Sequence, residues 1–407
     1  MRYILVLVSF ALAACSPGTP QGSDEGRAPT LILISIDGFR ADFMDLYDVP
    51  NLSALAEGGV YANEGMLPVF PTKTFPNHYS IATGMYPAST GMVANTMFDE
   101  RRNEWFRISD REAVEDPFWW GGEPIWVTAE LQGQTSATFF WVGSEGPVKG
   151  IQPRYWFRHD ESVPGTERVD QVLAWLDLPA DDRPTVITLY FSDVDSQAHY
   201  HGPESAGARN AVEKTDALMG RLLQGLKDRR LEDSVNLMVV SDHGMTTVDP
   251  DSTVFLEDYF DPEDGMVVEY SPVLAIRPQR GREASVRAQL SQMPGVDLLG
   301  ASDLEAFNYS GHYRIPAVIA LAHEGWTIYS TREFPARSGP PNPGNHGYHP
   351  DSEGMRALFV AYGPAFERGV RVEPFENIHL YNLMARVVGL APAPNDGDFA
   401  VVESFLR

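Results

Sequence analysis

Three short runs of apolar, mostly β-branched residues stand out along the chain. They span residues 31–36, 186–191 and 235–240. Continuous apolar runs of this length predict strands that are buried on both faces, as in the centre of a parallel sheet. Each run is followed by carboxylates, which are Asp37, the pair Asp193 and Asp195, and Asp242. Ligands bind outside the carboxyl ends of such strands, so we expect these side chains to share one site.

Helical patterns separate the predicted strands. Apolar residues recur at helical spacing between residues 208 and 230, which predicts one helix. Residues 51–57 predict another, with Asn51 as its N-terminal cap and two glycines directly after its C-terminal end. Pro76 fits the first turn of a further helix that continues through residues 79–83. The order strand, helix, strand indicates an α/β fold in which helices flank a mostly parallel sheet.

The composition changes between residues 250 and 343. This segment predicts three strands and one helix, at residues 266–270, 273–276, 317–322 and 283–293. We interpret it as a smaller α+β lobe inserted into the sheet domain, from which residues 337–343 return. The main domain is then expected to cover residues 30–249 and 344–407, and to close with a strand at 356–362 and a helix at 378–390.

The N-terminus has the pattern of an export signal. Residues 1–14 hold one basic residue and an apolar run that is too short to span a bilayer as a helix. The residues before Cys15 resemble the lipobox of bacterial lipoproteins. We therefore expect lipidation of Cys15, a flexible tether over residues 15–29, and an exported lipoprotein of the outer membrane that faces the periplasm or the cell surface. An ordinary secretory signal is the alternative.

The net charge and the cysteine content limit which ligands the chain can bind and which covalent links it can form. The 407 residues carry a formal net charge of −25, which argues against a DNA or RNA polymer as the ligand. Small anionic substrates remain possible, because bound metal ions reverse the local field. Cys15 is the only cysteine, so no disulfide forms within the chain. We expect a monomer by default, and membrane contact through the lipid anchor alone.

Histidines accompany the carboxylates at the predicted strand ends. Asp195 and His199 are four residues apart, so both lie on one face if this stretch is helical. His243 follows Asp242 directly, and His346 lies in a turn after the predicted lobe. Together with Asp37 they form two sets of three ligands, and mixed imidazole and carboxylate donors suit zinc. Each of these residues taken singly is more simply a turn or loop residue.

Thr74 lies in a turn rich in proline and aromatic residues, just before the helix that Pro76 begins. A hydroxyl at a helix N-terminus is close to free N–H groups, which hold anions. Taken alone, Thr74 is more simply a helix cap. The metal-ligand set changes this interpretation, because a hydroxyl beside metal ions is a candidate nucleophile.

Four motifs carry a family resemblance. TKTFPNHY at residues 72–79, the Asp195–His199 pair, SDHGM at 241–245 and NHGY at 345–348 resemble the nucleotide pyrophosphatase/phosphodiesterase family of the alkaline phosphatase superfamily. The resemblance follows the family's motif order from residue 31 to the end of the chain. It includes WWGGEP, GPES and APNDG, at residues 119–124, 202–205 and 393–397. It implies an alkaline-phosphatase-like fold.

The resemblance also implies roles for individual residues. One zinc would bind Asp195, His199 and His346, and the other would bind Asp37, Asp242, His243 and the Thr74 oxygen. Thr74 would be the nucleophile of a phospho-threonine intermediate, and Asn95 would donate a hydrogen bond to a phosphate oxygen. One departure is His349, which stands where the family often has an acidic residue.

Two aromatic residues flank these motifs. Phe75 follows Thr74, and Tyr190 lies just before the strand end that carries Asp195. Aromatic faces beside a phosphate site suit stacking on a nucleobase, so we expect both residues to bind substrate. Packing in the core is the alternative for both.

We therefore expect hydrolysis of phosphodiester and pyrophosphate bonds of nucleotides to nucleoside 5′-monophosphates. A phosphomonoesterase, a phosphonate hydrolase or a lysophospholipid or choline-phosphate phosphodiesterase would use the same site. A metal-binding lipoprotein without catalysis is a further alternative. We do not expect a sulfatase, because the Cys/Ser-x-Pro-x-Arg signature of that enzyme class is absent around Thr74.

Overall fold

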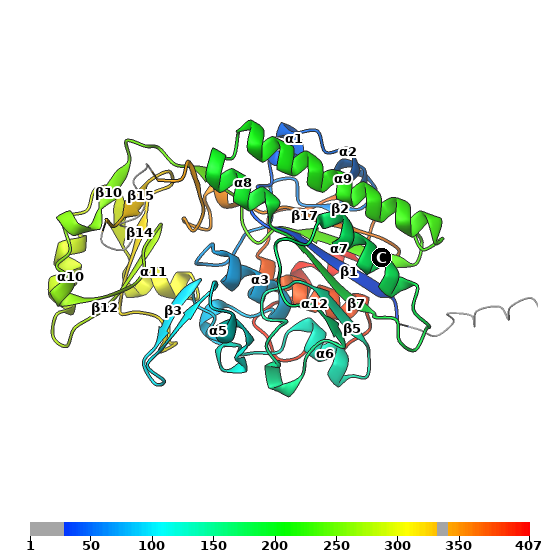
Figure 1. Cartoon of the computed structure of the whole chain (residues 1–407), viewed down its shortest axis with the longest axis horizontal. Helices are drawn as coiled ribbons and strands as arrows, with labels where there is room; N and C mark the ends of the chain where they lie inside the picture. The colour runs from blue at the N-terminus through cyan, green and yellow to red at the C-terminus, as the bar shows by residue number, and fades with distance from the viewer. Residues whose placement is uncertain (1–27, 332–340) are drawn as a thin grey trace, which may run out of the picture.

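The computed structural model describes residues 28–331 and 341–407 (Figure 1). The predicted signal peptide, Cys15, most of the tether and part of the predicted return loop at 337–343 lie outside these residues. The core of the fold is an eight-stranded sheet in the order β18-β2-β17-β8-β1-β7-β5-β6. Its strands are β1 (Thr30–Ile36), β2 (Val60–Tyr61), β5 (Ser136–Phe139), β6 (Tyr155–Trp156), β7 (Val186–Phe191), β8 (Val235–Val240), β17 (Phe359–Tyr362) and β18 (Val370–Arg371).

The three predicted apolar strands lie side by side in the middle of this sheet. β1 pairs in parallel with β7 on one side and with β8 on the other, and β7, β5 and β6 continue the parallel order. On the other side of β8, β17 runs antiparallel to β8 and to β2, and the edge strand β18 is parallel to β2. The predicted α/β fold with a mostly parallel sheet is therefore confirmed.

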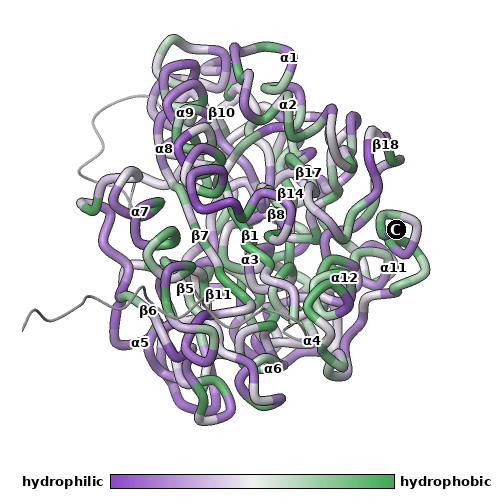
Figure 2. The backbone as a smooth tube through the Cα atoms, turned by 90° about the vertical axis from the view of Figure 1, so that its right-hand side faces the viewer, coloured by the Kyte–Doolittle hydropathy of each residue, from purple (hydrophilic) through white to green (hydrophobic). Residues whose placement is uncertain are grey.

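Helices cover both faces of the sheet (Figure 1). α2 (Pro50–Gly58), α7 (Gly165–Leu176) and α9 (Ala206–Asp228) pack with Ile32 and Ile34 of β1, whereas α3 (Thr74–Thr83), α6 (Ile125–Leu131) and α12 (Leu380–Val387) pack with Leu31 and Leu33. Successive side chains of a strand point to opposite faces, so β1 contributes to both cores and reads as one continuous apolar run. Figure 2 shows these central strands as hydrophobic segments inside the molecule.

Several boundaries differ from the sequence pattern. The helix expected at 378–390 is α12 (Leu380–Val387), and the strand expected at 356–362 is β17 (Phe359–Tyr362). α2 begins at Pro50, and Asn51 does not cap it; the Asn51 side chain instead donates to Asp216 Oδ2 of α9 at 2.7 Å. Proline fits the first helical position because its missing N–H has no partner there. The helix expected to reach residue 293 is α10 (Glu283–Leu290), which ends earlier.

The segment for which a smaller lobe is predicted holds a second, antiparallel sheet in the order β11-β12-β14-β13. Its elements are β11 (Gly265–Glu269), β12 (Val273–Pro278), β13 (Val296–Leu298), β14 (Val318–Ala322), α10 and α11 (Ala301–Ala306). This sheet has an apolar core of its own, formed by residues such as Leu274, Ile276 and Leu290. It lies at one end of the main sheet (Figure 1). The strands β10 (Thr253–Phe255) and β15 (Thr327–Tyr329) form a separate, short parallel pair in the same segment.

A two-stranded hairpin lies between the second sheet and the main domain (Figure 1). It consists of β3 (Thr96–Asp99) and β4 (Glu104–Arg107). Arg314, from the loop between α11 and β14, is buried against it and donates to Asp99 Oδ2 at 2.8 Å. The same guanidinium donates to the carbonyl oxygens of Gly91, Trp119 and Phe118, so one side chain ties the second sheet to the main domain.

The remaining elements are short. They are α1 (Phe43–Leu46), α4 (Pro87–Thr90), α5 (Arg111–Glu115), α8 (Asp193–His201), β9 (Thr246–Thr247) and β16 (Gly344–Asn345). Within residues 28–331 and 341–407, no helix has both the length and the apolar composition that crossing a membrane requires.

Candidate active site

The carboxyl ends of β1, β7 and β8 meet at one edge of the sheet. Ser35 of β1 pairs with Tyr190 of β7 and with Val240 of β8, so the residues that follow each strand emerge together. Gly38 lies at this edge with φ +68°, and a Cβ atom there would come within 2.9 Å of the Asp195 backbone. Glycine at this position thus allows α8 to approach β1, and its N–H donates to Asp242 Oδ1 at 3.2 Å.

The first predicted ligand set comes together as three side chains from two distant stretches. Asp195 and His199 lie one turn apart in α8, as the spacing predicts, and Nε2 of His199 is 3.4 Å from Oδ1 of Asp195. Nε2 of His346 is 3.8 Å from the same oxygen. Donor atoms of all three residues lie within 4.8 Å of one another, which is close enough to bind one metal ion.

The second predicted set lies directly beside the first. Nε2 of His243 is 2.9 Å from Oδ2 of Asp242 and 3.5 Å from Oδ1 of Asp37. Asp37 and His243 also group with Asp195 of the first set within 4.8 Å, and the rings of His243 and His346 stack with centroids 3.5 Å apart. All six predicted ligands therefore form one continuous cluster.

The histidines are oriented as metal ligands require. Nδ1 of His199, His243 and His346 lies 2.8, 2.8 and 2.9 Å from the backbone carbonyl oxygens of Gly344, Gly244 and Thr72. A carbonyl only accepts, so Nδ1 carries the proton and Nε2 faces the carboxylates with its lone pair. The departure at His349 does not weaken this support, because Thr72 holds His346 and the exposed His349 packs on Phe307.

The charged forms of two carboxylates of the cluster, Asp37 and Asp195, are unfavourable without a cation. Oδ1 of Asp37 and Oδ1 of Asp195 are buried and make no hydrogen bond within the described part of the chain. Burial, with the neighbouring Asp242 carboxylate, raises the pKa of Asp195 to about 7, and burial with both neighbouring carboxylates raises the pKa of Asp37. Burial and the adjacent His243 lower the pKa of His346, which keeps it neutral. Divalent cations would compensate the crowded carboxylates, so the residues fit a two-metal site.

The Thr74 hydroxyl points to this cluster and does not cap its helix. Thr74 is the first residue of α3, where Lys73 occupies the cap position without a side-chain cap bond. Oγ1 of Thr74 is 3.3 Å from Nε2 of His243. The next N–H of the helix, from Phe75, donates to Oδ1 of Asn95 at 3.0 Å, so Asn95 lies close to Thr74.

His78 lies in the helix that begins at Thr74 and contacts both Thr74 and the candidate ligand Asp242. Its Nδ1 is 3.0 Å from the Thr74 carbonyl oxygen and 3.2 Å from Oδ2 of Asp242, and its Nε2 is 2.7 Å from Oγ of Ser35. Burial opposes its charge, yet the Asp242 carboxylate raises the pKa of His78. Its position one helical turn after Thr74 was the signal available in the sequence.

A cavity of about 410 Å³ opens beside the cluster. Asp37, Thr74 and Asp195 line it together with aromatic side chains, which are Phe75, Phe140, Trp141, His159 and Tyr190. Phe75 packs on Phe106 and Trp120 with one part of its ring. Tyr190 does more than line the wall, because its hydroxyl donates to Oδ2 of Asp37 at 2.6 Å.

Comparison with known proteins agrees with this geometry. The signature of the family described as type I phosphodiesterase/nucleotide pyrophosphatase matches residues 31–349. Ectonucleotide pyrophosphatase/phosphodiesterase family member 3 from Bos taurus is 36% identical over 407 residues, which cover 97% of this chain and 45% of that protein. The chain thus spans slightly less than half the length of this curated relative.

A solved structure of murine ectonucleotide pyrophosphatase/phosphodiesterase 5 superimposes with a TM-score of 0.87 at 31% identity, and covers 93% of this chain and 100% of that one. An inactive variant of the murine protein, in which a threonine is replaced by alanine, is solved in complex with AMP and superimposes equally well. The sequence signature, the shared fold and the clustered aspartate, histidine and threonine side chains agree: this chain belongs to the type I phosphodiesterase/nucleotide pyrophosphatase family of the alkaline phosphatase superfamily.

Proposed function

We propose that this chain hydrolyses phosphodiester and pyrophosphate bonds of nucleotides and releases nucleoside 5′-monophosphates. The observation that carries the proposal is the position of the Thr74 hydroxyl, 3.3 Å from His243 at the edge of a cluster of six carboxylate and imidazole ligands. A nucleophile beside two adjacent metal sites is the arrangement that phosphoryl transfer uses.

The ions we propose are two zinc ions. Asp195, His199 and His346 would hold one, and Asp37, Asp242 and His243 would hold the other beside Thr74. Mixed nitrogen and oxygen donors favour zinc over magnesium or calcium, which prefer oxygen ligands alone. When bound, such a pair polarises the phosphoryl oxygens and lowers the pKa of a neighbouring hydroxyl.

The residues of the chain then carry the two chemical steps. Thr74 gives up its hydroxyl proton to solvent, and its oxygen forms a bond to phosphorus as the bond to the leaving oxygen breaks and that oxygen takes up a proton. Water hydrolyses the resulting phospho-threonine, which restores Thr74 and releases the monophosphate. Asn95, held by the Phe75 N–H, donates to a non-bridging phosphate oxygen and stabilises its charge.

The cavity of about 410 Å³ is the proposed nucleoside site. Its size lies within the range of small-ligand pockets, and the exposed part of Phe75 offers a face on which a base can stack. The AMP complex of the murine structure supports a nucleotide as ligand. The Tyr190 ring forms part of the cavity wall. Its hydroxyl donates to Asp37 and thereby positions this carboxylate as a ligand of the proposed metal ion.

The test compares two chromogenic substrates with the full chain. Release of nitrophenol from the nitrophenyl diester of thymidine 5′-monophosphate should exceed release from nitrophenyl phosphate, and chelation should abolish it. A preference for the monoester would favour a phosphatase. Bound zinc without any turnover would favour a metal-binding protein without catalysis.

We also propose that the protein is an exported lipoprotein anchored through Cys15, at the outer membrane facing the periplasm or the cell surface, and monomeric. The support is the lipobox-like sequence before Cys15 and the polar tether after it, both of which precede the described residues. A membrane anchor of this kind would keep the catalytic domain in the aqueous phase next to the bilayer.

A further inference from the structure

Trp120 belongs to the WWGGEP motif at residues 119–124, to which the proposed function gives no role. Its side chain is buried. The next residue, Gly121, donates its N–H to the Thr90 carbonyl oxygen at 3.1 Å, and a Cβ at Gly121 would come within 2.3 Å of that oxygen. Only glycine allows so close an approach, so the motif fixes the backbone from which the indole of Trp120 projects.

The Trp120 indole packs against Phe75, the residue that offers its ring to a base in the proposed nucleoside site. The two ring centroids are 6.1 Å apart, and the ring planes are tilted by 32°. Tyr79, one turn after Phe75 in α3, packs on the same indole with centroids 5.0 Å apart. Phe106 contacts both partners, with its centroid 5.8 Å from Phe75 and 5.8 Å from Trp120. Aromatic contacts of this kind hold the Phe75 ring in one orientation.

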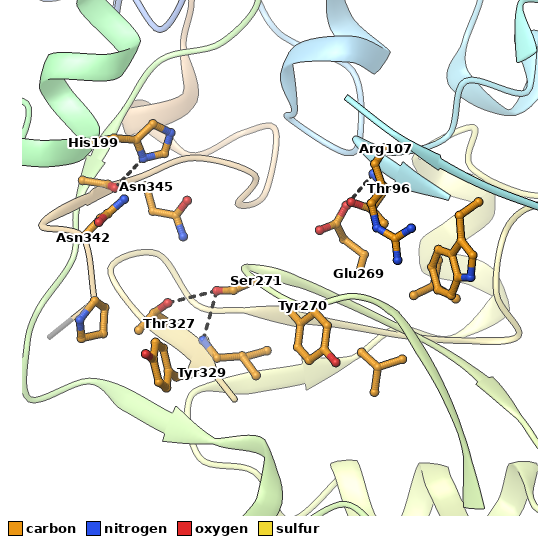
Figure 3. Close-up of a pocket in the computed structure, with 16 residues that line it drawn as sticks. Thr96, Arg107, His199, Glu269, Tyr270, Ser271, Thr327, Tyr329, Asn342 and Asn345 are labelled. Carbon is orange, nitrogen blue, oxygen red and sulfur yellow. Dashed lines mark hydrogen bonds between the residues drawn. The ribbon is translucent and has the colours of Figure 1, made fainter. Parts of the chain in front are cut away.

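Phe106 comes from β4 of the hairpin, which lies between the nucleoside cavity and a second cavity of about 390 Å³ (Figure 3). Successive side chains of a strand point to opposite faces, and β4 follows this rule. Phe106 is buried against Phe75 and Trp120, whereas its neighbour Arg107 lines the second cavity. The Phe75 ring is thus held by the hairpin as well as by Trp120, and its remaining part lines the nucleoside cavity.

The same indole also holds two other parts of the cavity wall. Nε1 of Trp120 donates to the carbonyl oxygen of Val114, a residue of α5 that lines the cavity, at 2.9 Å. Gly143 lines the cavity as well, and a Cβ there would come within 3.1 Å of the indole. A phenylalanine would keep ring contacts but offers no N–H donor, so tryptophan is the residue type that holds all three parts of the wall.

We infer that Trp120 is a positioning residue of the nucleoside site, which acts through Phe75, Val114 and Gly143 to keep the cavity in the shape that a base requires. The inference rests on the proposed function and adds a determinant of its substrate preference. A stacking partner that is already fixed loses little conformational entropy when a base binds. The support by Trp120 therefore strengthens binding of the nucleoside rather than attack on phosphorus.

Two diesters with the same leaving group test this role. They are the nitrophenyl diester of thymidine 5′-monophosphate and nitrophenyl methyl phosphate, which has no nucleoside. With the metal-loaded full chain, the ratio of kcat/KM for the nucleoside diester to that for the methyl diester should fall about tenfold in Trp120→Leu, mainly through KM of the nucleoside diester. Trp120→Phe keeps a ring beside Phe75 but loses the N–H, so its ratio should lie between those of Trp120→Leu and the wild type.

Trp126→Leu is the matched control. Trp126 of α6 is buried in the same apolar cluster as Trp120, but it is not among the described residues that line the cavity. Both leucine variants should unfold at a lower temperature than the wild type, and only Trp120→Leu should change the ratio. A binding measurement removes the dependence on turnover: in a metal-loaded Thr74→Ala background, Trp120→Leu should weaken binding of thymidine 5′-monophosphate about tenfold more than binding of inorganic phosphate.

The inference and the proposed function fail in distinguishable ways. A wild-type ratio in every Trp120 variant that folds, or the same fall in ratio in Trp126→Leu, would overturn the role of Trp120 and leave the proposed function intact. Absence of turnover of both diesters by the metal-loaded wild type would overturn the proposed function. Binding of thymidine 5′-monophosphate against inorganic phosphate would then still decide whether Trp120 shapes the nucleoside cavity.

Discussion

The hydroxyl of Thr74 lies 3.3 Å from Nε2 of His243, although 169 residues separate them along the chain. The contact exists because α3 begins at Thr74, at the edge of the sheet where β8 ends at Val240 just before Asp242 and His243. It brings a helix N-terminus, which favours anions, next to a cluster of ligands for cations. The fold thus places a group that favours anions beside candidate ligands for cations, as the proposed phosphoryl transfer requires.

Replacement of Thr74 tests the nucleophile. Thr74→Ala should lower kcat by at least about a thousandfold, because it removes the oxygen that would form the covalent intermediate. Thr74→Ser keeps a hydroxyl and should retain part of the rate. Metal content, measured by mass spectrometry, should stay near two ions per chain in both variants. Wild-type turnover in Thr74→Ala would refute the assignment.

Replacement of Asp242 tests the metal cluster. Asp242→Ala removes a carboxylate that faces His243 at 2.9 Å and should lower both the zinc content and the rate. Asp193→Ala is the matched control, since Asp193 follows β7 at the same sheet edge but pairs with Lys214 at the surface. Equal zinc content in the two variants would exclude Asp242 as a ligand.

His78 is expected to position its neighbours. His78→Gln should weaken metal affinity about 10- to 100-fold, the usual effect of losing a group that orients a ligand, because Asp242 loses its imidazole partner at 3.2 Å. Calorimetric titration of zinc into the metal-free protein measures this affinity. His323→Gln, at an exposed histidine of the second sheet, should bind zinc like the wild type. If His78→Gln binds zinc equally well, His78 is only a packing residue.

The buried ion pair between Arg314 and Asp99 predicts a pH-dependent stability. Burial opposes the charge of Asp99, but hydrogen bonds from Tyr313 and Arg314 lower its pKa to about 2. A lowered pKa stabilises the folded state above the unfolded value near 4, and this contribution disappears as the pH falls toward 2. Asp99→Asn should therefore cost about 2 kcal/mol near pH 7 and much less near pH 2.5.

Urea unfolding of the wild type and Asp99→Asn at several pH values measures this difference. Asp182→Asn is a surface control, because Asp182 pairs with Arg154 where both side chains are nearly half exposed. A free-energy difference for Asp99→Asn that does not change with pH would show that the pKa of Asp99 is the same in the folded and unfolded protein, which would contradict this prediction.

Replacement of Cys15 tests the proposed lipid anchor. Cys15→Ala should move the protein from the membrane fraction to the soluble fraction of cells, because the lipid chains that the cysteine would carry are lost. Ser16→Ala, next to it, should leave fractionation unchanged. A Cys15→Ala variant that stays in the membrane fraction would count against lipidation.

The amino-acid sequence alone predicts those elements that depend on residues close to one another along the chain. Continuous apolar runs predicted β1, β7 and β8, because a strand buried on both faces needs apolar residues at every position. The four-residue spacing of Asp195 and His199 predicted that both would face one ion from α8. The motifs at the strand ends are sufficient to indicate the family, because they are recognisable from the sequence without knowledge of the contacts.

Contacts between side chains that are far apart along the chain are visible only in the folded structure. The Thr72 carbonyl orients His346, the Tyr190 hydroxyl bonds to Asp37, and a hairpin separates two cavities. None of these contacts follows from spacing, because each depends on how separate elements pack and on which face of a strand each side chain occupies. The pattern along the chain thus specifies the chemistry of the ligands, whereas packing specifies their orientation and the shape of the space around them.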